Sequence, residues 1–147
     1  MSHKSDSQVQ RSAEVKLLRL LSTRERLSLA PRKLALRDGV RVAVDGFDVR
    51  RRVLCEAYAH VGKTHGSQPG KVAKDILKFV TFEKARGLKY RKILCFADKA
   101  AASCVLGKRW LAEAARLFKV EVITLNLPAK TRSILRAAQR RQVMVNR

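Results

Sequence analysis

Two acidic side chains stand on neighbouring apolar segments, and their types and spacing suit metal chemistry. Asp45 lies in the run VAVDG at 42–46, and Glu56 lies eleven positions later in the run VLCEA at 53–57. Both runs alternate as half-buried strands do, so they predict a hairpin with the two carboxyl groups on one side of a sheet, roughly 5 Å apart at Cβ. Two carboxylates this close repel each other unless a cation joins them. We therefore expect Asp45 and Glu56 to hold Mg²⁺, or Mn²⁺ in its place, an ion that can generate hydroxide for phosphodiester hydrolysis.

The net charge points to a polyanionic partner for this site. The 147 residues include 33 Lys+Arg and 12 Asp+Glu, which gives a formal net charge of +21. The basic residues are spread over the whole chain, so most of the folded surface should attract a polyanion such as nucleic acid. Because 46% of residues are hydrophobic, the chain can build a core and is not expected to be a disordered basic peptide.

The same composition bears on the compartment. No segment approaches the roughly 18 apolar residues of a membrane span, and the N-terminal segment lacks the apolar stretch of a secretory signal. Cys55, Cys95 and Cys104 are odd in number and lack CxxC spacing, which disfavours a zinc site and a disulfide framework. We expect a cytoplasmic protein with buried thiols and no membrane partner. A mitochondrial transit peptide is the alternative for the Ser-, Arg- and Leu-rich first thirty residues, and their three acids count against it.

The elements that must position the two acids form a single three-layer α/β domain with a mixed β-sheet, in the predicted order α-β-β-α-β-α-β-α. Residues 1–10 are expected to be a mobile N-terminal arm, and residues 11–147 a single basic domain. A first helix begins at Ser12, and Pro31 and Asp38-Gly39 interrupt it. The other predicted elements are strands over 40–45 and 52–60, a helix over 71–84, a strand over 92–97, a helix over 100–118, a strand over 120–125 and a helix over 130–142.

Three details of this arrangement are predicted as well. The strand-helix-strand unit over 92–125 should be parallel and right-handed. The helix over 100–118 should direct Leu111 and Leu117 inward, and Trp110 stands where a core residue is expected. Asp48 is expected to be a turn residue, and Asp98 is expected to cap the helix that follows it.

The order of elements around the acids resembles the PD-(D/E)XK nuclease superfamily. Its restriction-endonuclease-like core runs helix, strands, helix, strand, with an acid on one strand and an E-x-K motif on the next. Asp45 matches the first acid and Glu56 the second, over about residues 14–97. The resemblance implies a Mg-dependent DNA endonuclease, with DNA favoured over RNA. Many nucleases of this superfamily cut as dimers, so a homodimer is a state to test.

Two positions depart from the superfamily's pattern. Val44 stands where the motif has proline, and Tyr58 stands where it has lysine. Some members draw the lysine from the neighbouring helix, so Lys71 and Lys74 are the expected catalytic replacements, with Lys63 as a further candidate.

Phosphate contacts are expected from the basic residues that surround the acids. The Gly-rich loop over 62–70 is basic, and the helix after it carries a stripe of lysines opposite its apolar face. Contacts made chiefly to phosphate should weaken steeply with salt. The residues expected to bind nucleic acid are Arg50, Arg51, Arg52, His60, Lys63, His65, Lys71, Lys74 and Lys78.

A structural role for the two acids is the competing interpretation. In that case Asp45 begins a turn before Gly46, while Glu56 pairs with an arginine of 50–52 on a solvated sheet face, where such pairs contribute about 0 to 1 kcal/mol. The chain would then be a non-catalytic basic α/β DNA- or RNA-binding protein, or a structural component of a ribonucleoprotein. The sequence leaves open whether the chain is an enzyme.

Overall fold

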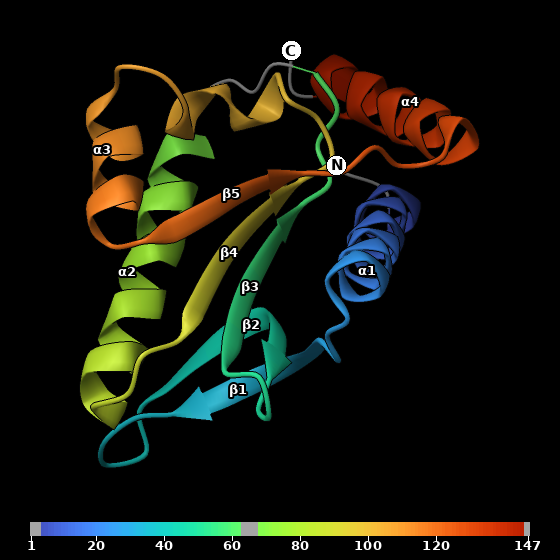
Figure 1. The fold of residues 1–147 in the computed structure, drawn as a ribbon. Helices are drawn as coiled ribbons and strands as arrows, with labels where there is room; N and C mark the ends of the chain where they lie inside the picture. Colours follow the sequence, from blue (N-terminus) through green and yellow to red (C-terminus); the bar gives the residue numbers. More distant parts are fainter. Residues whose placement is uncertain (1–3, 63–67, 146–147) are drawn as a thin grey trace.

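A five-stranded mixed sheet organises the computed structural model, which describes residues 4–62 and 68–145 (Figure 1). The strands lie in the order β1-β2-β3-β4-β5. The elements are α1 (Lys4–Glu25), β1 (Ala30–Ala35), β2 (Arg41–Asp48), β3 (Val53–Tyr58), α2 (Gln68–Arg86), β4 (Arg91–Phe96), the 3-10 helix η1 (Ala101–Val105), α3 (Trp110–Leu117), β5 (Val120–Thr124) and α4 (Ala129–Val145).

The sheet has an antiparallel half and a parallel half. β1, β2 and β3 form an antiparallel meander, whereas β3, β4 and β5 run parallel. α1 and α4 lie together on one face of the sheet, and α2, η1 and α3 cover the other (Figure 1). The predicted three-layer α/β domain, the hairpin of β2 and β3 and the parallel strand-helix-strand unit are therefore confirmed. None of the helices in the described segments is long and apolar enough to cross a membrane.

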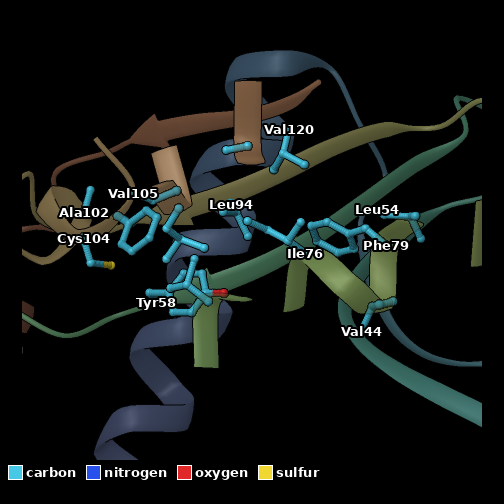
Figure 2. Packing of buried hydrophobic residues seen from close by; sticks show 14 of the residues in the cluster. Val44, Leu54, Tyr58, Ile76, Phe79, Leu94, Ala102, Cys104, Val105 and Val120 are labelled. Atoms are coloured by element: carbon cyan, nitrogen blue, oxygen red, sulfur yellow. The ribbon is translucent and has the colours of Figure 1, made fainter. Parts of the chain in front are cut away.

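The alternation along β3 divides the core into two layers. Val53, Cys55 and Ala57 pack among the residues of α1, whereas Leu54 and Tyr58 pack toward α2. All six residues of β3 are buried, as expected of a strand covered by helices on both faces. Figure 2 shows Tyr58 in the same apolar layer as Ile76 and Phe79 of α2. By the same alternation, Glu56 faces α2 from inside this layer.

The first helix begins earlier than the sequence predicts. Helix α1 begins at Lys4, so the prediction of a mobile arm is wrong for residues 4–10; Met1 to His3 lie outside the described residues. Asp6 is only 1% exposed, and its carboxylate lies 2.6 Å from the guanidinium of Arg141 in α4. This contact with the far end of the chain holds the first turns of α1, and no local pattern reveals it.

Strand β1 was missed because its sequence, APRKLA, contains a proline and buries only Leu34. As an edge strand it tolerates a residue that has no backbone N–H. The observed order is therefore α-β-β-β-α-β-α-β-α, with η1 before α3.

The predicted helix over 100–118 is divided by a turn. Gly107 adopts a positive φ of 76° between η1 and α3, a conformation that suits glycine. The break changes the rotational phase of the second half, so Leu111 and Ala115 face the core. The inward positions predicted for Trp110 and Leu117 are wrong, because their side chains are 76% and 63% exposed.

Candidate active site

Asp45 and Glu56 meet where β2 and β3 separate. The paired residues of the two strands end at Gly46 and Cys55. Beyond this pair, the side chain of Asp45 takes the place of a backbone carbonyl of β2: its Oδ2 accepts a hydrogen bond of 2.9 Å from the backbone N–H of Ala57 in β3. The predicted juxtaposition of the two acids is thus present, and the aspartate lies within β2 rather than at the start of a turn.

Glu56 is buried and makes an ion pair with α2. Its side chain is 5% exposed, and Oε1 lies 2.8 Å from Nζ of Lys78. Lys78 Nζ also lies 3.2 Å from Oδ1 of Asp75 and donates a hydrogen bond of 2.7 Å to the carbonyl of Ala43. The alternative in which Glu56 pairs with an arginine of 50–52 on a solvated face is therefore wrong.

Tyr58, two residues beyond Glu56, lies between the strand and α2. Its hydroxyl donates a 2.5 Å hydrogen bond to Oδ2 of Asp75, and its ring stacks on Phe96 with centroids 4.5 Å apart. Tyr58 thereby fixes Asp75, and Asp75 in turn contacts Lys78. The cationic group reaches the acids from α2, three residues beyond Asp75, and not from the strand.

Burial and the neighbouring acids strongly perturb Glu56. The pKa of Glu56 is raised to about 9. Desolvation is the largest cause, followed by a hydrogen bond with Asp45 and by the negative charges of Asp45 and Asp75, while Lys78 opposes the shift. A hydrogen bond between two carboxyl groups requires that one of them keep its proton. The pair therefore holds a proton at neutral pH.

Lys78 stays positively charged in this setting. Burial lowers its pKa, but the contacts with Glu56 and Asp75 outweigh burial and raise it. The site accordingly combines a proton-bearing carboxyl pair with a fixed ammonium group.

The donor set at the two acids suits a small divalent cation. Oε1 of Glu56 is buried, and within the described residues its charge partner is the ammonium group of Lys78, 2.8 Å away. In the described part of the chain, no three His, Cys, Asp or Glu side chains are grouped to hold a metal ion. Mg²⁺ is commonly bound through one or two carboxylates with water and substrate phosphate as its other ligands, so Asp45 and Glu56 fit that mode.

A hollow of about 210 Å³ opens beside Tyr58. Glu14 of α1, His60, Lys71 and Gln142 of α4 are among the residues that line it. Burial and the charge of Asp45 raise the pKa of Glu14, so this third acid lies within electrostatic reach of the site. Sequence analysis missed Glu14 as a site residue, because nothing in a helical pattern indicates which turn of α1 faces the acids.

The predicted lysines of α2 lie at different distances from the acids. Lys78 contacts Glu56, and Nζ of Lys71 lies 5.4 Å from the centroid of the Tyr58 ring, at the hollow. Lys74 is exposed on α2, one turn before Lys78. The lysine at Glu56 is therefore one predicted only to bind phosphate. Lys63 and His65 lie outside the described residues.

The arginines of 50–52 lie in the turn between β2 and β3, and all three are exposed. Arg52 precedes Glu56 by four residues, roughly 13 Å along the strand. The arginines therefore lie at the turn end of the hairpin, and their contact with nucleic acid stays a prediction. Asp48 is the last residue of β2 and not a residue of the turn, but its carboxylate holds the turn, since it accepts hydrogen bonds from the N–H groups of Ser28 and Arg51.

The prediction that Asp98 caps the following helix is wrong, because Ala100 is the N-cap of η1 and no side chain caps it. The carboxylate of Asp98 accepts hydrogen bonds from the N–H of Ala100 before η1 and from the N–H of Gly62 after β3. It therefore ties the end of β4 to the segment that leaves β3 beside the hollow.

Comparison with protein-family models, with curated proteins and with solved structures found no match to this chain.

Proposed function

We propose that the protein is a metal-dependent nuclease of the PD-(D/E)XK type, in which Asp45 and Glu56 hold Mg²⁺ or Mn²⁺ and Lys78 is the lysine of the site. The observation that carries this proposal is the contact of two carboxyl groups where β2 and β3 separate, with an ammonium group 2.8 Å from one of them. The order of α1, the three antiparallel strands, α2 and β4 supports a restriction-endonuclease-like core.

The residues have distinct tasks in this mechanism. Asp45 and Glu56 would hold the divalent cation, whose positive charge would take the place of the shared proton and offset the repulsion between the two carboxylates; the proton would pass to solvent. A bound divalent ion supplies Lewis-acid stabilisation and a hydroxide nucleophile. Asp75 and the carbonyl of Ala43 hold Lys78, whose ammonium group neutralises charge that develops on the scissile phosphate.

Nucleic acid is the substrate class that suits this surface. The net charge of +21 attracts a polyanion, and Lys71 extends from the rim of the hollow next to Tyr58. The nuclease resemblance favours DNA over RNA. Binding through lysine and arginine contacts to phosphate should weaken as salt rises.

The test is metal-dependent cleavage by protein freed of nucleic acid. Labelled duplex DNA, single-stranded DNA and RNA are incubated with Mg²⁺ or Mn²⁺ and with wild type, Asp45→Asn, Glu56→Gln or Lys78→Ala. We expect at least one of the substrates to be cut, and cleavage to fall by about 10² or more in each variant, the scale of losing one stabilising donor in the transition state. Lys84→Ala is the matched control, since it removes an exposed lysine from the same helix, six residues beyond Lys78, and should retain cleavage.

A non-catalytic nucleic-acid-binding role is the second candidate, and one observation favours it. Lys78 and Tyr58 already provide charge and hydrogen-bonding partners for Glu56 and Asp75 within the fold, so the cluster is stable as a structural core. This candidate predicts undiminished binding by Asp45→Asn and Glu56→Gln, with no cleavage by any of the proteins. Preferential retention of folded RNA through purification would identify the ribonucleoprotein form of this role.

A further inference from the structure

A second basic surface lies on α4, outside the residues assigned above. Arg132, Arg136 and Arg140 follow one another at intervals of four residues, which places them on one stripe of the helix. Together with Ala129 and Ser133 they line a hollow of about 300 Å³. No Asp or Glu follows Glu121 in the sequence, so α4 offers these arginines no acidic neighbour of its own.

The stripe is arranged at a cost to the helix. Like charges four residues apart repel and destabilise a helix, so three arginines in series are not what helix stability alone would select. Arg141 shows the contrasting situation, since it lies off this stripe and is paired with Asp6. The stripe therefore keeps an excess of positive charge that an anion can neutralise.

One arginine of the stripe is held in place by the sheet. The guanidinium of Arg132 donates a 3.1 Å hydrogen bond to the carbonyl of Ala97 and lies 3.8 Å from Oδ2 of Asp98. That carboxylate is also bonded to the N–H groups of Gly62 and Ala100. Among the ion pairs of the described residues, Asp98 pairs with Arg132, and one negative charge against the three arginines of the stripe leaves the hollow cationic.

Helix α4 connects this hollow to the candidate active site. The side-chain amide of Gln139 accepts a hydrogen bond from the N–H of Val61 at 3.0 Å and donates one of 2.8 Å to its carbonyl. Gln142, less than one turn further, lines the hollow beside Tyr58. α4 thus borders both hollows, and it lies at the end of the sheet where β3, β4 and β5 finish (Figure 1).

We propose that the arginine hollow of α4, formed by Arg132, Arg136 and Arg140, is a second phosphate-binding site, which holds the nucleic-acid backbone as it leaves the active site; its partner and direction rest on the proposed function. Guanidinium groups bind phosphate through paired hydrogen bonds. The first and the last of the three arginines are eight positions apart, a rise of about 12 Å along the helix. One strand of duplex carries a phosphate every 3.4 Å or so along its axis, so the stripe covers about three to four nucleotides.

The test compares two double variants that lose the same charge. Arg136→Gln/Arg140→Gln removes two exposed arginines of the hollow, and Lys108→Gln/Arg109→Gln removes two exposed cations from the segment before α3, across the sheet. Arg132 is left intact because of its contact with Ala97. Binding of labelled single-stranded and duplex DNA is measured by fluorescence anisotropy without metal, over a range of salt concentrations.

We expect the slope of log K against log salt to become shallower in the hollow variant by about 1.4 for single strands and about 1.8 for duplex, as two phosphate contacts are lost. The control variant should change the slope by less than half as much. Equal slopes for the two variants would overturn the proposal. So would loss of binding to phosphatidylserine vesicles by the hollow variant with its DNA slope unchanged, which would identify a membrane partner instead.

The readout separates this proposal from the nuclease proposal. A selective change of slope without cleavage by the wild-type protein supports the arginine hollow and refutes the nuclease. Cleavage by the wild type together with equal slopes for the two double variants supports the nuclease and refutes the arginine hollow.

Discussion

Replacing Glu56 by Gln should remove a large part of the pH dependence of stability in metal-free protein. The pKa of Glu56 is about 9 in the folded protein, whereas an unperturbed glutamate side chain, as in the unfolded chain, has a pKa of 4.5. Because the folded state holds the proton more tightly, the contribution of this group to stability is complete below pH 4.5 and is lost as pH rises toward 9. The slope is about 1.4 kcal/mol per pH unit, so wild type should lose roughly 2 to 3 kcal/mol between pH 5.5 and 7.5.

The assay is urea unfolding followed by far-ultraviolet circular dichroism in the presence of EDTA, at several pH values across that window. Glu56→Gln should show a much flatter dependence than wild type, because the amide does not titrate. Glu83→Gln is the control: Lys92 and the N–H of Tyr90 outweigh the burial of Glu83 and lower its pKa, so its contribution is lost only as pH falls. Above pH 5.5 the free energy of unfolding of Glu83→Gln should therefore change with pH as that of the wild type does.

Parallel stability curves for wild type and Glu56→Gln would refute the reasoning, since a buried, proton-bearing carboxyl must produce a difference in slope. Added Mg²⁺ gives a second readout. If Asp45 and Glu56 bind the ion, it displaces the shared proton, and stabilisation by Mg²⁺ should grow as pH rises.

Two further substitutions probe the packing around the site. A Cβ at Gly46 would lie 3.1 Å from Cδ2 of Leu18, so Gly46→Ala should lower the free energy of unfolding by about 1 to 3 kcal/mol; Gly70→Ala, with open space around it, is the control in urea unfolding. Tyr58→Phe removes the hydroxyl that donates to the buried Asp75. It should cost about 1 to 3 kcal/mol in the same measurement, and an unchanged midpoint would show that water replaces the hydroxyl.

The sequence predicted the strands that carry the acids better than the groups that surround them. Alternation around Asp45 and Glu56 identifies two adjacent strands, and the strands are antiparallel neighbours. Which lysine approaches them depends on how α2 is rotated about its axis. Lys74 and Lys78 share a stripe, and only the packing of α2 on the sheet places the second beside Glu56.

Contacts between distant parts of the chain were beyond local patterns. Glu14 reaches the site because α1 packs against β3 and β4, a tertiary arrangement that no spacing within the helix contains. Helix α1 likewise owes its first turns to Arg141, 135 residues away. Trp110 was placed inside because helical periodicity was extended through Gly107, where the backbone turns.

The contacts of α4 set the order in which the molecule can be completed during synthesis. The segment after β3 is held by Gln139, and the start of α1 is held by Arg141, so they depend on residues that are made 78 and 135 positions later. On the ribosome, where the N-terminal part of a chain emerges first, Asp45 and Glu56 are available long before α4. Full assembly of their surroundings must therefore wait until α4 has emerged and can make these contacts.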